Sequence, residues 1–182
     1  PEAIVNQKVD QVAEQVVSLQ RQRLENLKRD NPAQALVAAE QLLAFRPGDV
    51  ETLLTKADIH LELSQLDHAL AAISAAAEAA PADQRETIRQ RAVALDLLHT
   101  LMKPDNRPFD VTLADVHRLA ESDAQLPKVQ GLLKPLANRL YRLAKTDDRF
   151  LGDKSFQGLL DRTLARLMPP ETQLAADWKS IK

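Results

Sequence analysis

Four histidines are the side chains that most invite a chemical role: His60, His68, His99 and His117. Zinc sites and metalloproteases place histidines at fixed short spacings such as HExxH, and no such spacing occurs in this sequence. The chain also has no cysteine, which excludes thiolate nucleophiles, cysteine metal ligands and disulfides. We therefore expect structural or solvated histidines, with no metal site and no cofactor.

Paired carboxylates are the next candidates, because two of them can divide general acid and general base work. Asp147 and Asp148 are adjacent, but they lie in a polar, loop-like run with nothing to mark a pocket. The GxGxxG, Walker, GxSxG and kinase motifs do not occur. We therefore expect no catalytic residues, and an enzyme with an unrecognised site is the third of three functional hypotheses.

A run of basic residues gives a possible binding surface near the C-terminal end. It consists of Arg139, Arg142, Lys145 and Arg149. The three- and four-residue spacing predicts that Arg142, Lys145 and Arg149 share one helical face. Nearby aspartates partly neutralise this region, so a solvated helix face and a contact for an acidic partner both stay open.

The composition indicates an all-α protein. Aromatic residues make up only 3% of the chain and glycine occurs four times, whereas alanine and leucine, both strong helix formers, dominate the apolar content. The formal net charge of −2 argues against nucleic-acid binding, which needs an excess of Lys and Arg. No apolar run approaches the roughly 20 residues of a membrane span. We expect a soluble chain, with cytoplasm and periplasm equally compatible.

Apolar spacing and capping signals predict a series of helices in the first half of the chain. We expect helices over residues 4–28, from Pro32 to a stop at 46–49, over 50–63 and over 66–79. Asn31 followed by Pro32 is a typical helix start. Helices joined by such short turns must lie antiparallel to their neighbours.

The same region repeats with a period of 34 residues, which separates Pro47 from Pro81 and Ala35 from Ala69. This is the period of the tetratricopeptide repeat. The unit from residue 50 to 83 resembles that family through small residues at Ala57 and Ala69, which would let two helices approach closely. The resemblance is clearest over residues 32–83 and weaker over 16–102.

The resemblance implies a concave face whose lining can be assigned by repeat position. The implied lining residues are Glu51, Leu54, Asp58, Leu61 and Glu62, followed by Ile88 and Leu95 in the next repeat. An apolar stripe edged by acids would suit an amphipathic helix or peptide with a basic rim. Alternatively, the chain's own flanking helices fill this groove, because large uncovered apolar patches are rare.

The opening helix carries a second apolar pattern of its own. Val5, Val9, Val12, Val16 and Leu19 alternate at spacings of four and three residues. This spacing predicts a helix face that packs into a bundle, or a short coiled coil with a second copy of the chain.

Beyond residue 103 the pattern is helical but no longer repetitive. Pro135 falls within an apolar helical segment, four residues after Gly131, and predicts a kinked helix or two helices meeting at residues 134–135. We expect a repeat region at residues 1–103 and a C-terminal helical region at 104–182 packed on it. The leading hypothesis is a protein–protein interaction module, an adaptor or scaffold belonging to a larger bacterial protein. The second is an oligomerisation module that self-associates through the opening helix.

Overall fold

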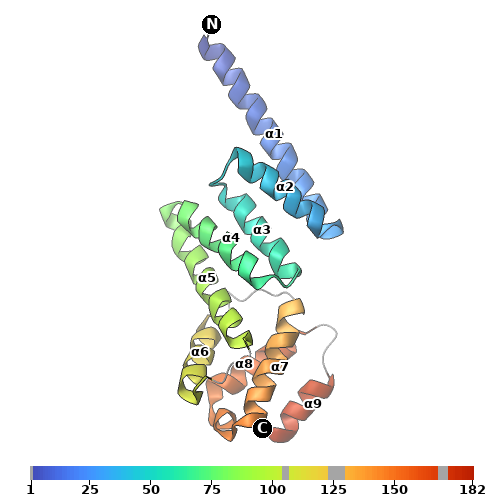
Figure 1. The fold of residues 1–182 in the computed structure, drawn as a ribbon, viewed down its shortest axis with the longest axis vertical. Helices are drawn as coiled ribbons and strands as arrows, with labels where there is room; N and C mark the ends of the chain where they lie inside the picture. The colour runs from blue at the N-terminus through green and yellow to red at the C-terminus, as the bar shows by residue number, and fades with distance from the viewer. Residues whose placement is uncertain (1, 104–106, 123–129, 168–171) are drawn as a thin grey trace.

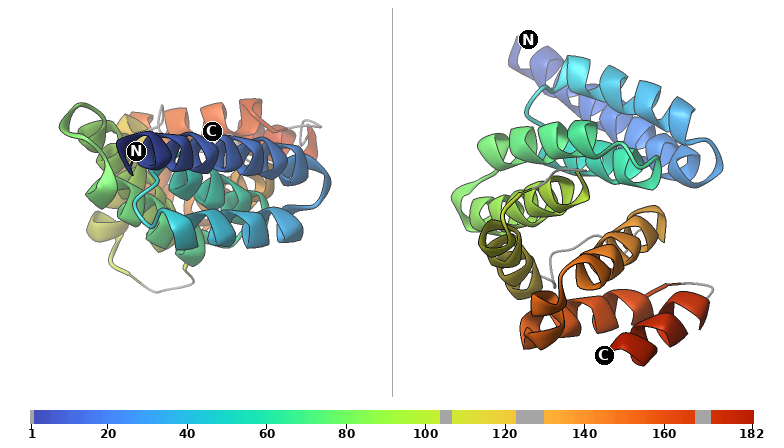
Figure 2. Two further views of the ribbon diagram at one scale, coloured as in Figure 1. Left: turned by 90° about the horizontal axis from the view of Figure 1, so that it is seen from above. Right: turned by 60° about the horizontal axis from the view of Figure 1, so that its bottom comes forward.

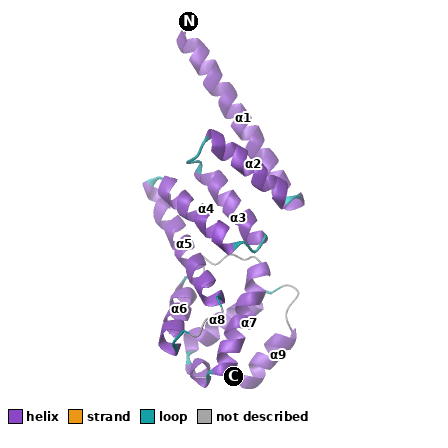
Figure 3. Cartoon of the chain, in the orientation of Figure 1, coloured by secondary structure: helices purple, strands orange, loops and turns teal. Residues whose placement is uncertain are grey.

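The computed structural model describes residues 2–103, 107–122, 130–167 and 172–182, with side chains from residue 11 onward except at 130 and 172. Within these ranges every regular element is helical, as the sequence predicted (Figure 3). The elements are α1 (Glu2–Asp30), α2 (Pro32–Phe45), α3 (Val50–Glu62), α4 (Leu66–Ala79), α5 (Ala82–Met102), α6 (Phe109–Glu121), α7 (Gln130–Thr146), the 3₁₀ helix η2 (Asp148–Gly152), α8 (Lys154–Ala165) and α9 (Thr172–Ile181).

Side-chain caps set the starts of α2 and α3. Asn31 Oδ1 accepts a hydrogen bond from the Gln34 amide at 3.1 Å, and Pro32 occupies the first turn of α2. Asp49 Oδ2 accepts from the Thr52 amide at 3.0 Å at the start of α3. Burial tends to raise the pKa of Asp49, but the hydroxyl and amide of Thr52, together with Arg21, hold that pKa below its usual value. The turns before α2 and α3 therefore each end in a fixed helix start.

The helices pack in chain order and give an elongated molecule. Each of α1 to α4 packs on the next helix along the chain, and α6 and α7 both pack on α5 (Figure 1). The first part of α1 extends beyond the end of α2 (Figure 1). Helices α1 and α2 thus form one end of the molecule, and α8 and α9 form the other (Figure 2).

Two apolar cores hold the structure together. The larger core begins in α3 and continues through α9, so it extends across the predicted boundary at residue 103. The smaller core joins α1 and α2 to Ile59 of α3. Residues 104–106, which adjoin that boundary, lie outside the described residues.

Helix α7 continues through Pro135 as one element. Of the two alternatives that this proline suggested, two separate helices meeting at 134–135 is therefore wrong. The proline ring would crowd the carbonyl of residue 131. Glycine there serves a second purpose, because a Cβ on Gly131 would lie 2.8 Å from Ser64 Oγ in the turn between α3 and α4. The absence of a side chain lets the start of α7 approach that turn closely.

Overpacking the contact between α3 and α4 is expected to destabilise the chain. Ala57 and Ala69 are both fully buried, as their small size predicted. We expect Ala57→Leu or Ala69→Leu to lower the free energy of unfolding by about 1–3 kcal/mol, because a buried isobutyl group has no space between the two helices. Ala71→Leu on the exposed side of α4 is the matched control in thermal melts. Unchanged melting temperatures for both buried variants would contradict this packing.

Candidate functional site: an apolar surface on α1 and α2

Exposed apolar side chains concentrate on the first two helices. Eight large apolar side chains are strongly exposed among those described, and five of them belong to α1 and α2. The eight are Val12, Val16, Leu19, Val37, Phe45, Leu63, Val93 and Val111. Single exposed apolar residues are common on protein surfaces, whereas a group on adjoining helices indicates a contact site. We call the first five residues, with the cleft between their helices, the α1–α2 surface.

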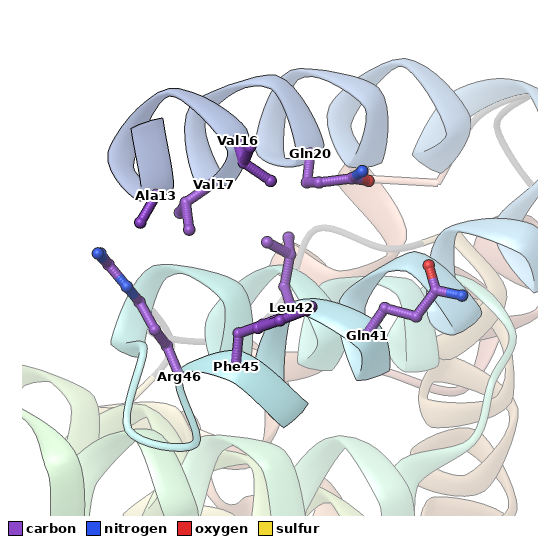
Figure 4. Close-up of a pocket in the computed structure, with 8 residues that line it drawn as sticks. All are labelled: Ala13, Val16, Val17, Gln20, Gln41, Leu42, Phe45 and Arg46. Atoms are coloured by element: carbon purple, nitrogen blue, oxygen red, sulfur yellow. The ribbon is translucent and has the colours of Figure 1, made fainter. Parts of the chain in front are cut away.

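A cleft of about 470 Å³ runs between α1 and α2 within this surface (Figure 4). Its lining consists of Ala13, Val16, Val17 and Gln20 from α1 and Gln41, Leu42, Phe45 and Arg46 from α2. Val17 and Leu42 are buried and close the cleft at its base. Phe45 is 81% exposed, which leaves almost the whole ring available to a partner.

The cleft exists because α1 has two apolar faces. Val17 and Leu24, seven residues apart, are buried in the small core against α2. Val12, Val16 and Leu19 lie roughly a third of a turn away around the helix, since each residue advances it by about 100°. Packing on α2 therefore covers the first face and leaves the second exposed.

Polar groups frame the cleft without entering its base. Arg46 donates to Glu14 Oε1 across the gap between α1 and α2. This hydrogen bond holds the pKa of Glu14 below its usual value and raises the pKa of Arg46. The side chains of Gln20 and Gln41 flank the same cleft (Figure 4). The site therefore offers apolar contact area with polar edges, which suits binding of an amphipathic helix.

The stripe predicted to line an open concave groove is not exposed, and that expectation is wrong for most of its members. Leu61 and Leu95 are each 1% exposed and Ile88 is also buried, while Leu54 is half-buried. The physical reason is α7, which packs on both α3 and α5 and contributes its leucines to the same core. At these positions the chain's own helices fill the groove, which was the alternative expectation.

The acids at the edge of that stripe are largely matched by bases of the same chain. Asp58 accepts from Arg91 of α5, and its other oxygen lies 3.4 Å from Lys28 Nζ of α1. Glu51 Oε2 lies 3.0 Å from Arg21 Nη1. Glu62 is exposed at the end of α3. The acids thus tie α3 to its neighbouring helices, which explains their spacing without a basic partner.

The basic residues of the C-terminal region do not form one helical face. Helix α7 ends at Thr146 because Asp147 accepts from the Arg149 amide, so Arg149 belongs to η2. Arg149 also donates to both oxygens of Asp147, at 2.6–3.1 Å, and its guanidinium lies 4.0 Å from the Phe109 ring centroid. This pairing lowers the pKa of Asp147 and raises that of Arg149.

The other three basic residues have separate surroundings. Arg139 donates to the Leu101 carbonyl at 3.0 Å, and Lys145 lies 5.7 Å from the Tyr141 ring centroid. Arg142 is exposed and lines a different cleft from the one that Arg149 lines. The four basic side chains therefore do not converge on a single anion-binding site.

Each of the four histidines contacts a polar or aromatic side chain of the same chain. His60 Nδ1 is 2.7 Å from Gln65 Oε1, and its ring stacks on His68 with centroids 5.1 Å apart. His99 Nε2 lies 3.3 Å from Asp67, and His117 Nε2 lies 2.9 Å from Asp153. In the described part of the chain no three metal-binding side chains converge.

Two residues of the α1–α2 surface were not singled out from the sequence. Val37 and Phe45 are eight residues apart on α2 with Gln41 between them, which places all three on one helix face. This spacing could have predicted the exposed face of α2 from the sequence. The buried alanines of α2 gave a stronger signal, and they define the packed face, about a third of a turn away.

Comparison of the chain with family models, curated proteins and solved structures found no match. None of the helices in the described ranges has the length and apolar character required to span a bilayer.

Proposed function

We propose that this chain is a protein–protein interaction module, an adaptor or scaffold, and that it binds an amphipathic helix on its α1–α2 surface. The observation that supports this most is the grouping of Val12, Val16, Leu19 and Phe45 around an apolar cleft. Burying such side chains contributes roughly 25 cal/mol per Å² of apolar area, so their exposure in the free chain leaves binding energy for a partner.

We further propose that α2 to α5 form a tetratricopeptide-like array that supports this surface. Fully buried Ala57 and Ala69 at the contact between α3 and α4 favour this proposal, as does the 34-residue period. In this proposal the partner does not use the concave face, because α7 packs against it. The array provides a rigid base, and the exposed side chains at its N-terminal end provide the contact.

The test is a capture experiment with matched valine variants. Val16 and Val93 have the same side chain and nearly equal exposure, 48% and 47%, but only Val16 lines the cleft. We expect the unaltered chain and Val93→Glu to retain the same partner from a host extract, and Val16→Glu to retain at least tenfold less. Equal retention by all three proteins would refute the proposed surface. Circular dichroism must show that Val16→Glu keeps its helix content.

A further inference from the structure

Helix α1 carries an apolar face that no other helix covers over its described side chains. Val12, Val16 and Leu19 are exposed there, Leu19 by 65%. The sequence continues the same alternation of three- and four-residue steps through Val9 and Val5. The five positions from Val5 to Leu19 span just over two heptads, and their spacing fits the seam of a helix pair. This spacing fits a partner helix that carries the same repeat.

The charges along α1 indicate which helix that is. Residues 2–14 carry three acids and one base, a net charge of −2, whereas residues 21–30 carry four bases and two acids, a net charge of +2. The acids and base of the first part are Glu2, Asp10, Glu14 and Lys8; the second part has Arg21, Arg23, Lys28 and Arg29 with Glu25 and Asp30. An antiparallel copy of α1 would place the acidic first part of one helix beside the basic second part of the other, whereas a parallel copy would place like charges together. Arg21 and Lys28 also pair with Glu51 and Asp58 of α3 in the same chain, so they contribute less to this complementarity.

We propose that the helix bound by the α1–α2 surface is α1 of a second copy of this chain, packed antiparallel in a symmetric homodimer. The proposal rests on the proposed function and names its partner. In the register that pairs the apolar stripe with itself, Val9 lies opposite Leu19 of the other copy and Val12 lies opposite Val16. The twofold axis then passes near residue 14, and each patch meets an identical patch.

The residues beside the seam fit this arrangement. Ala13 and Gln20 flank it on one side and Gln15 and Gln22 on the other, so the flanks near the axis are small or uncharged. Phe45 borders the cleft together with Ala13 and Val16, which are the positions nearest the axis. The two Phe45 rings would therefore lie beside the centre of the dimer, where buried aromatic side chains contribute most to binding.

Light scattering coupled to size exclusion, over a range of chain concentrations, measures the association. We expect the unaltered chain and Val93→Glu to be dimers, and Val16→Glu to bind at least about 100-fold more weakly. Symmetry places two new carboxylates in the seam, one from each copy, and loss of a hot-spot contact at the centre of an interface costs this much. Equal helix content by circular dichroism would show that Val16→Glu is folded. A monomer at every concentration, or a dimer insensitive to Val16→Glu, overturns the proposal.

Cysteine cross-linking distinguishes the orientation, because the natural chain contains no cysteine. In the antiparallel dimer Gln15→Cys lies close to its own copy and forms an interchain disulfide. Gln22→Cys lies roughly 20–25 Å from its copy along the helix axis and does not. In a parallel pair the two copies of each cysteine would lie on opposite sides of the seam, so neither variant would cross-link, and that result contradicts the proposed orientation.

The outcome separates this proposal from the proposed function. If the chain is monomeric but a foreign protein is still captured through Val16, the second copy is excluded and the interaction module stands. If no association of either kind depends on Val16, both proposals fail.

Discussion

Replacing Leu61 with glutamate is expected to abolish the cooperative thermal unfolding transition of this chain. Leu61 is 1% exposed in the core that α3 shares with α5 and α7. A carboxylate buried there without a partner costs several kcal/mol, and the lost leucine packing adds to that cost. We expect a total loss of more than about 4 kcal/mol, which is most of the stability of an ordinary domain.

Leu63→Glu is the matched control for this experiment. Leu63 lies two residues further along the chain, at the end of α3, and its side chain is exposed. We expect that variant to melt within a few degrees of the unaltered chain, because exposed positions tolerate substitution within about 0.5 kcal/mol. A Leu61→Glu protein that melts like the control would show that α7 leaves the concave face open.

Local signals in the sequence were sufficient to place the helices of the first half. Asn31 and Asp49 accept hydrogen bonds from amides within three residues of themselves, so the cap and the helix it starts are adjacent in the chain. The small side chains of Ala57 and Ala69 likewise favoured a close helix contact, and both residues are fully buried. Information of this kind is contained in short windows and can be recognised without a structure.

The burial of Leu61 and Leu95 depends on a helix that follows much later in the chain. Spacing shows that a leucine faces something apolar, but it does not show whether that surface belongs to another protein or to α7. The deciding feature is the close approach of Gly131 to Ser64, which are 67 residues apart. Contacts this distant in sequence leave no periodic signal.

The opening helix shows a different limit of pattern analysis. The strongest apolar stripe, with Val12, Val16 and Leu19, predicted either the face that packs into the bundle or the seam of a coiled coil. The structure instead buries Val17 and Leu24 against α2 and leaves the stripe exposed. The hydrophobicity of the α1 side chains alone could not show which of the two faces packs on α2. The packed face fits because it meets the small alanines of α2. The basic residues show the same limit of pattern analysis, because the cap at Asp147 ends α7 before Arg149.

Replacing Trp178 with alanine is expected to lower the free energy of unfolding by about 3–5 kcal/mol. Trp178 is 1% exposed and is the one fully buried large side chain that α9 contributes in the described ranges. Its ring meets Phe156 of α8 edge to face at a centroid distance of 6.5 Å, and Nε1 donates to Asp161 Oδ1 at 2.7 Å. Removing the indole creates a cavity at this contact and removes a hydrogen bond to a carboxylate.

Trp178→Phe separates the packing contribution from the hydrogen bond. Burial tends to raise the pKa of Asp161, but Lys182 and the Trp178 N–H hold it below its usual value, so the carboxylate is ionised near neutral pH. Phenylalanine retains an aromatic ring and removes only the donor, and we expect a loss of about 1.5–3 kcal/mol, smaller than that of alanine. Urea denaturation followed by circular dichroism measures all three proteins, since both variants lack the only tryptophan of the chain. If alanine costs no more than phenylalanine, the ring does not pack α9 against α8, and the hydrogen bond to Asp161 alone holds this helix.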